Sequence, residues 1–294
     1  KYFDKDLIIP LCCYSTKKIE DSKYIPYNVY TCSKCNTLQT KYLGNLNEIY
    51  KINHADSTGI IMKGLHNKVK EILITQKNII LNNIVEIGAA KGLLSDIILD
   101  NNIVSKYYII EPNYFGTNRD NKYIINKYFE NTNSQDYEDC NTILMSHVFE
   151  HFYNPMKILS LIEKNKNIDN VILVWPDLEH YKDNNIYHIL NTEHTYYIDN
   201  NFIIDLFNNI SFKLIDRYNY LGHSVIFVFK KYDNIIKKKI KNTNYDFLNY
   251  FNQILEKKKY IEEIIKNNNN KKIFLWPASV HSQFLLMFLN DIKI

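Results

Sequence analysis

A turn framed by two glycines constrains the fold of this chain more than any other stretch. The apolar run 84–87 ends at Gly88, and Gly92 opens the amphipathic segment 93–99. An apolar run, a turn and a helical period in succession predict a strand, a tight turn and a helix. The chain has only 7 Gly, and two of them stand here. Because glycine lets backbone approach a ligand closely, and the N–H groups at a helix start face that ligand, the turn predicts a nucleotide-type cofactor site.

The residues of the turn separate two nucleotide-binding families. A dinucleotide-binding turn reads Gly-x-Gly-x-x-Gly, whereas here Ala89 or Ala90 stands at the middle glycine and Glu86 precedes Gly88 by two residues. The turn instead resembles the first motif of class I S-adenosylmethionine (SAM) methyltransferases, acidic-x-Gly-x-Gly-x-Gly, without its central glycine. That resemblance implies cofactor contacts from Glu86, Gly88, Ala89 and Gly92.

Two further strands are predicted after the helix. The first covers residues 104–110 and ends in Glu111, about 20 residues past the turn, where such folds hydrogen-bond ribose hydroxyls. Glu111 is therefore the predicted ribose ligand, and Pro112 follows it. A strand at 123–128 comes next. The resemblance places Glu130 beyond it, where the family contacts adenine.

A fourth strand, from residue 142, runs into a distinctive loop. Residues 146–155 read Ser-His-Val-Phe-Glu-His-Phe-Tyr-Asn-Pro. They resemble the family's His-Val-Leu-Glu-His-x-x-Asp-Pro segment, which is the more specific of the two matches. The resemblance implies that Ser146 and His147 lie against the cofactor. His151 is either a substrate contact or a residue that opens a helix, and we expect the second.

Length and composition exclude several classes of protein. The 294 residues suit one large domain or two, and a formal charge of +4 is mild for a nucleic-acid-binding protein. The sequence has no apolar run of roughly 18 residues, as a membrane span requires, and no signal-type start. Its 5 Cys lack the spacing of a disulfide framework. We expect a cytoplasmic monomer or homodimer without nucleic-acid or membrane partners, trimmed at its N-terminus and naturally longer at its C-terminus.

Cysteines near the N-terminus predict a metal site. Cys32 and Cys35 form a C-x-x-C knuckle that can grip one Zn²⁺, and a second pair would complete a tetrahedral site. Cys12 and Cys13 are adjacent, so three arrangements stay open. Both bind in strained geometry, or one binds together with a histidine such as His54, or the metal has been lost. Free buried thiols are the alternative without any metal.

A resemblance to one methyltransferase family covers nearly the whole chain. Cys-x-x-Cys-x-x-Leu-Gln at 32–39 is similar to the zinc-binding module of sugar C-methyltransferases, which methylate nucleotide-linked deoxysugars. It implies a structural zinc module at 1–45, a SAM-binding domain at 46–232, and a helix plus the start of a Rossmann-like domain at 233–294. In this last part we predict a long charged helix at 245–266.

The same resemblance implies the catalytic residues. The family pattern Tyr-His-Glu-His-x-x-Tyr-Phe holds the proposed general base, and Glu193, His194 and Tyr197 match its core. Asn191 and Thr192 replace the upstream Tyr-His, which leaves the exact reaction open. Histidine, with a pKa near 6.5, suits proton removal at neutral pH, and the neighbouring glutamate would orient it.

Two other histidines are candidates for the substrate side. His54 stands where the family has an aromatic residue in a stretch with substrate and cofactor contacts. His223 lies just before the last predicted strand, and we place it facing the pocket from a neighbouring loop. That strand, at 224–229, and one at 212–217 are predicted to pair in antiparallel fashion, after an amphipathic helix at 202–208.

Together these features predict an α/β protein with a class I methyltransferase (Rossmann-like) sheet and helices on both faces. A small N-terminal zinc module and a partial second Rossmann-like unit flank it. The predicted function is SAM-dependent O- or C-methylation of a nucleotide-linked sugar for glycan assembly, with another small-molecule acceptor as an alternative. A non-catalytic SAM-fold scaffold is the first rival, and the missing central glycine is its support. An RNA-binding protein with a Cys knuckle is the second, disfavoured by the modest charge.

Overall fold

The computed structural model describes residues 7–10, 24–50, 59–186, 190–233 and 247–274. Cys12, Cys13 and His54 lie outside this part, as does the segment from residue 275 onward that was expected to open a second Rossmann-like unit.

The chain forms two compact units. The first comprises Lys1–Ile49, Leu178–Asn200 and Lys241–Ile294, and the second comprises Tyr50–Asp177 and Asn201–Ile240. The sequence-based division into three domains stays a prediction.

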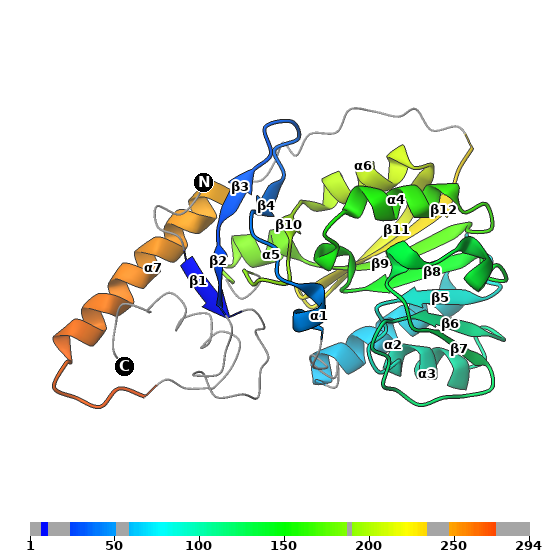
Figure 1. Ribbon diagram of the computed structural model, residues 1–294, viewed down its shortest axis with the longest axis horizontal. Coiled ribbons are helices and arrows are strands. Elements are labelled where there is room, and N and C mark those ends of the chain that lie inside the picture. Colours follow the sequence, from blue (N-terminus) through cyan, green and yellow to red (C-terminus); the bar gives the residue numbers. More distant parts are fainter. Residues whose placement is uncertain (1–6, 11–23, 51–58, 187–189, 234–246, 275–294) are drawn as a thin grey trace. The chain divides into compact units, whose positions relative to one another are not determined.

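The second unit is built on a seven-stranded sheet in the order β11-β12-β9-β8-β5-β6-β7 (Figure 1). Its strands are β5 (Ile84–Ile87), β6 (Tyr107–Ile110), β7 (Lys122–Ile125), β8 (Thr142–Ser146), β9 (Asn170–Pro176), β11 (Phe212–Tyr220) and β12 (Ser224–Lys231). The five strands β5 to β9 run parallel, and β12 is antiparallel to both β9 and β11. The predicted α/β sheet and its closing antiparallel pair are confirmed.

Helices cover both faces of this sheet, which explains why its central strands are apolar throughout. Helices α2 (Ile60–Thr75) and α3 (Leu93–Asp100) lie on one face, and α4 (Pro155–Lys164) and α6 (Asn200–Asn209) on the other (Figure 1). All seven residues of β9 are buried. Leu65 and Val69 of α2 and Ile98 of α3 are fully buried in the core on the first face. None of the described helices is long and apolar enough to cross a membrane.

Three sequence-based boundaries were wrong. The strand predicted from residue 104 begins at Tyr107. The strand predicted to reach residue 128 ends at Ile125, and a 3-10 turn, η2 (Phe129–Asn131), follows it. His151 does not open a helix, because it ends the 3-10 turn η4 (Phe149–His151). Helix α4 starts later, where the Asn154 side chain accepts a hydrogen bond from the Lys157 N–H and Pro155 fits the first helical position. A third 3-10 turn, η3, covers Ser134–Tyr137.

The first unit contains two small sheets. β1 (Leu7–Pro10) pairs with β2 (Tyr24–Tyr27), and β4 (Leu38–Thr40) pairs with β3 (Val29–Thr31) and β10 (Tyr196–Tyr197). Its helices are α1 (Leu46–Ile49), α5 (Leu178–Asp183) and α7 (Phe247–Asn267). Helix α7 confirms the long charged helix predicted near the C-terminus.

Candidate functional site

The sheet reverses its strand order between β5 and β8. From β5 the chain proceeds outward to β6 and β7, then returns to β8 on the other side of β5. Ligands of open α/β sheets bind outside the carboxyl ends of the strands at such a reversal. Both loops meet there: a Cβ placed on Gly88 would lie 2.6 Å from Cγ2 of Val148, just past β8. The predicted cofactor turn therefore stands at the expected binding edge.

The turn has three residues with left-handed backbone. Gly88 has φ +72°, Ala90 +48° and Gly92 +69°. The N–H of Gly92 donates to the carbonyl of Ala89 at 2.7 Å, which closes the turn. Ala90, rather than Ala89, thus occupies the position of the missing central glycine. A left-handed conformation costs a residue with a Cβ roughly 1–2 kcal/mol, so surrounding contacts must hold it.

Glu111 supplies such a contact. Its Oε2 accepts a hydrogen bond from the Ala90 N–H at 3.2 Å, and its Oε1 accepts one from the Asn113 N–H at 3.1 Å. Burial raises the pKa of Glu111, and the two backbone donors partly offset that effect. Each carboxylate oxygen has a second lone pair. The side chain can therefore brace the turn and accept a ligand hydroxyl at the same time.

Tyr128 lies close to this carboxylate and was missed by the sequence analysis. Burial raises the pKa of Tyr128, and the nearby charges of Glu111 and then Glu130 raise it further. Glu130 itself is half-buried in η2. The only signal in the sequence was the position of Tyr128 at the end of the predicted third strand. Tyr128 and the two glutamates thus gather near the carboxyl end of β6.

The loop after β6 packs directly on the glycine turn. A Cβ on Gly116 would lie 1.9 Å from the carbonyl oxygen of Lys91, so the two backbones touch. The Lys91 ammonium lies 5.3 Å from the centre of the Phe115 ring. The turn is consequently fixed from the side of the loop that carries Glu111.

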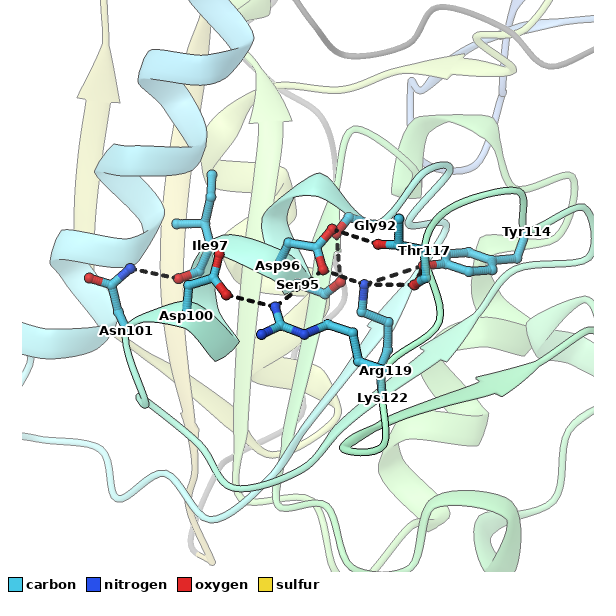
Figure 2. A network of polar contacts seen from close by, with 10 residues as sticks. All are labelled: Gly92, Ser95, Asp96, Ile97, Asp100, Asn101, Tyr114, Thr117, Arg119 and Lys122. Atoms are coloured by element: carbon cyan, nitrogen blue, oxygen red, sulfur yellow. Dashed lines mark hydrogen bonds and ion pairs between the residues drawn. The ribbon is translucent and has the colours of Figure 1, made fainter.

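A partly buried ion pair connects the same loop to α3. Figure 2 shows Asp96 beside the cations of Lys122 and Arg119. The Lys122 side chain is fully buried, and its Nζ lies 2.6 Å from Asp96 Oδ1. Nζ also donates to Tyr114 Oη at 3.3 Å and to the Thr117 carbonyl at 3.2 Å. Lys122 thereby ties the start of β7 and the preceding loop to the helix that begins at the glycine turn.

Glu86, a predicted cofactor contact, is buried in the interior of the sheet. It is 3% exposed, and its Oε2 accepts a hydrogen bond from the Tyr107 hydroxyl at 2.8 Å. Burial raises the pKa of Glu86 to about 7, against the opposing effects of Tyr107 and Lys122. This carboxyl group therefore changes its charge near neutral pH, and it lies directly behind the turn.

Ser146 ends β8, and His147 opens the loop that follows it. The Ser146 hydroxyl is buried and finds no hydrogen-bond partner among the described residues. Such orphaned polar atoms are rare in folded proteins, and a bound ligand is one way to satisfy them. His147 has a left-handed backbone, φ +52°, and its Nε2 lies 2.8 Å from Ser224 Oγ. Ser224 is a second residue that the sequence analysis did not single out.

The predicted catalytic residues Glu193, His194 and Tyr197 belong to the first unit. The N–H groups of Glu193 and His194 both donate to Asn191 Oδ1 at 2.9 Å. Asn191, which departs from the family pattern, therefore shapes this turn. The His194 and Tyr197 rings lie 6.3 Å apart, and the Tyr197 hydroxyl is 2.6 Å from that of Tyr27.

The Cys32–Cys35 turn has features of a metal-binding knuckle. The Asn36 N–H donates to the Cys32 carbonyl at 2.8 Å, and Asn36 has a left-handed φ of +59°. The N–H groups of Cys35 and then Lys34 lower the pKa of the Cys32 thiol. A thiolate is the form that binds metal, and the environment of Cys32 favours it.

Comparisons with known proteins give a likeness of fold only. No protein-family model and no curated protein matches the chain. The methyltransferase domain of bacterial CtHen1 has a TM-score of 0.47 at 8% identity, covering 58% of this chain and 99% of that one. 1,6-Didemethyltoxoflavin-N1-methyltransferase of Burkholderia thailandensis has a TM-score of 0.48 at 9% identity, covering 70% and 99%. N-methyltransferase NodS of Bradyrhizobium japonicum has a TM-score of 0.43 at 10% identity, covering 60% and 99%.

The fold class rests on the chain's own strand order. Five parallel strands, reversed at β5 and β8 and closed by an antiparallel pair, make the class I methyltransferase sheet. Likenesses at these low identities say nothing of the substrate.

The raised pKa of Glu86 predicts a pH-dependent cost in stability. Its folded pKa of about 7 lies above its ordinary value of 4.5, so the folded state binds the extra proton between these values. The contribution of Glu86 to the free energy of unfolding is fully present below pH 4.5. It is lost as pH rises through 7, by roughly 3 kcal/mol in all. Glu86→Gln, which cannot ionise but can still accept from Tyr107, should remove this loss.

Urea unfolding at pH 5 and pH 8.5 measures the effect. We expect Glu86→Gln to gain stability over the wild type at pH 8.5 and to differ little at pH 5. The same substitution at the exposed Glu138 is the control, and it should leave the pH dependence unchanged. Parallel pH profiles for the wild type and Glu86→Gln would contradict the assignment.

Proposed function

We propose that this protein is a SAM-dependent methyltransferase acting on a small-molecule acceptor. The observation that carries the proposal is the position of Glu111, whose carboxylate braces the glycine turn through Ala90 at the strand-order reversal. A carboxylate at the end of the second strand is suited to accept the ribose hydroxyls of an adenosyl cofactor. When bound, SAM would supply a sulfonium methyl group for in-line displacement.

Other residues fit an adenosyl cofactor. The buried Ser146 hydroxyl, without a partner among the described side chains, is available to the ligand. Tyr128 and Glu130 lie on the Glu111 side, where the adenine would lie in the family that the sequence resembles. Glycines Gly88 and Gly92 leave the turn without side chains at its two ends. Orienting the acceptor and excluding water is most of what methyl transfer asks of the protein.

In the sequence, the missing central glycine was the support for a non-catalytic scaffold. The conformation of Ala90 weakens that support. Ala90 adopts the left-handed conformation that a glycine would take there. The turn therefore keeps its backbone conformation at a modest energetic cost. A scaffold would have no need to retain that strained residue.

For the acceptor we propose a nucleotide-linked sugar, methylated on oxygen or carbon. The support is the sequence resemblance, together with the strand pairing that brings its cysteine motif and its Glu-His motif side by side in the first unit. Leu38 and Gln39 of the cysteine motif pair in register with Tyr197 and Tyr196, which follow Glu193 and His194. On this proposal His194 is a candidate base. Screening nucleotide-linked deoxysugars against other small acceptors by mass spectrometry separates this proposal from transfer to another class.

We also propose a structural zinc ion at Cys32 and Cys35, in a protein of the reducing cytoplasm. The described cysteines are free thiols, and Cys32 is the one whose environment favours the thiolate. Their role would be to stabilise the β3–β4 turn, since structural zinc sites contribute directly to folding.

Binding of S-adenosylhomocysteine tests the cofactor site. By calorimetric titration we expect micromolar affinity, about −8 kcal/mol. Glu111→Ala should weaken binding by about 1–3 kcal/mol, because it removes a buried acceptor. Glu111→Gln, which retains one acceptor oxygen and the side-chain volume, should weaken it less.

The control is Asp120→Ala, which removes an exposed acid from the same β6–β7 connection. It should bind like the wild type. No binding by the wild type would favour the scaffold, and equal affinity in Glu111→Ala would mean that the ribose is held elsewhere.

Metal analysis tests the zinc proposal. Protein purified without chelator should contain about one zinc ion per chain, and Cys32→Ser should lose most of it because a thiolate ligand is gone. Cys140→Ser is the matched control, since burial raises the pKa of the Cys140 thiol and keeps it protonated. Zinc-free wild-type protein, or equal zinc in Cys32→Ser, would refute the site.

A further inference from the structure

An acidic residue, a hydroxyl and two histidines form one continuous chain of hydrogen bonds in the second unit. His147 Nδ1 lies 3.3 Å from Glu150 Oε1, and His147 Nε2 lies 2.8 Å from Ser224 Oγ. Ser224 Oγ in turn lies 2.7 Å from His223 Nδ1. The two imidazole rings meet edge to face, with centroids 5.4 Å apart.

The members come from separate parts of the fold. His147 follows β8, Glu150 lies in η4, and His223 and Ser224 stand at the hairpin between β11 and β12. Glu150 is 1% exposed and Ser224 is fully buried, whereas both histidines are half-buried. The chain thus runs from a buried carboxyl group to partly accessible imidazoles.

Its position links the chain to the cofactor turn. Val148, between His147 and Glu150, touches Gly88. His147 also keeps a left-handed backbone, φ +52°, although it has a Cβ. Strain of this kind persists where the surrounding structure enforces it, often at functional sites.

We infer that Glu150, His147, Ser224 and His223 form a proton relay that accepts the proton released by the acceptor during methyl transfer. The inference rests on the proposed function and adds a base within the unit that holds the cofactor turn. His223 is the catalytic residue of the relay, and the other three are positioning residues.

In the proposed resting state Glu150 is ionised, and the donor and acceptor rules then give the direction of each hydrogen bond. An ionised Glu150 only accepts, so His147 carries its proton on Nδ1 and its Nε2 accepts from the Ser224 hydroxyl. Ser224 Oγ then accepts from His223 Nδ1–H, which leaves the His223 lone pair on Nε2. Burial, and then the proximity of His147, lowers the pKa of His223 to about 4. His223 is therefore neutral at pH 7, as a base must be before it accepts a proton.

Three proton shifts convert the resting state of the relay into the state that holds the released proton. SAM, when bound, would supply the methyl group to the acceptor oxygen or carbon, and the electron pair of the broken carbon–sulfur bond would stay on the sulfur. The acceptor's proton moves to His223 Nε2, the His223 Nδ1 proton moves to Ser224 Oγ, and the Ser224 proton moves to His147 Nε2. His223 ends neutral with its proton on Nε2, and the positive charge rests on His147 beside Glu150. A buried carboxylate stabilises such a charge.

Titratable groups on every neighbouring element can affect this balance. His66 of α2 interacts with His147, and burial lowers its own pKa to about 4. His151 of η4 lies 3.9 Å from Glu150 and 3.2 Å from the Tyr50 hydroxyl. The N–H of Asp177, after β9, donates to the His223 carbonyl, and the His223 N–H donates to the Tyr220 carbonyl of β11.

Histidine-ring 15N NMR of the full chain tests the relay without any acceptor. At pH 7 we expect both His147 and His223 as Nδ1–H tautomers, assigned with His147→Gln and His223→Gln. Ser224→Ala should remove the Nδ1–H preference of His223, because the hydroxyl that accepts from this N–H is gone. Thr142→Val, which removes a buried hydroxyl at the other end of β8, should leave it intact. An Nε2–H resting tautomer in the wild type, or an unchanged His223 tautomer in Ser224→Ala, would overturn the relay.

Calorimetry and turnover separate this inference from the proposed function. Ser224→Ala should bind S-adenosylhomocysteine within about twofold of the wild type, and transfer to the nucleotide-linked sugar that the screen identifies should fall about a hundredfold or more. No binding by the wild type would refute the proposed function and leave the NMR result to decide the relay. Unchanged turnover in Ser224→Ala would refute the catalytic role.

Discussion

The parallel pairing of β5 with both β6 and β8 is the constraint on which the rest of the second unit depends. Since each strand of a parallel sheet ends at the same edge, the pairing brings the glycine turn, Glu111 and His147 to one rim. The helices that connect the strands cover both faces and make the strands apolar. Only the rim remains for polar chemistry, and there the chain places Glu111, His147 and Glu150.

Several ionisable groups near this rim reduce stability by being buried. Glu86 has a raised pKa, and His66 and His223 have lowered ones, each mainly because burial disfavours the charged form. Lys122 is buried too, but its ion pair with Asp96 at 2.6 Å compensates the charge. Apolar residues would serve a purely structural core better, and this gathering of titratable groups agrees with the proposed proton relay.

Local patterns in the sequence were sufficient for the elements and for much of the candidate site. The glycine turn, the carboxylate Glu111 and the loop at His147 were all placed by motifs that act over a few residues. Boundaries failed where a local signal was weak. β7 ends at Ile125, because the polar residues Asn126 and Lys127 interrupt the apolar run before Tyr128. His151 ends a 3-10 turn, because Asn154 and Pro155 provide a better helix start four residues later.

By itself, the sequence determined the strand–turn–helix unit, the α/β class and the identity of the carboxylate beside the turn, because spacing along the chain encodes each of them. Only the tertiary structure decided that Ala90 takes the glycine's left-handed backbone, since neighbouring contacts enforce that strain. It also decided that His147 and His223 both hydrogen-bond the Ser224 hydroxyl, although His147 lies 77 residues from Ser224 in the sequence and His223 directly precedes it. Contacts between strands far apart in sequence depend on sheet order and register, and no local pattern specifies those.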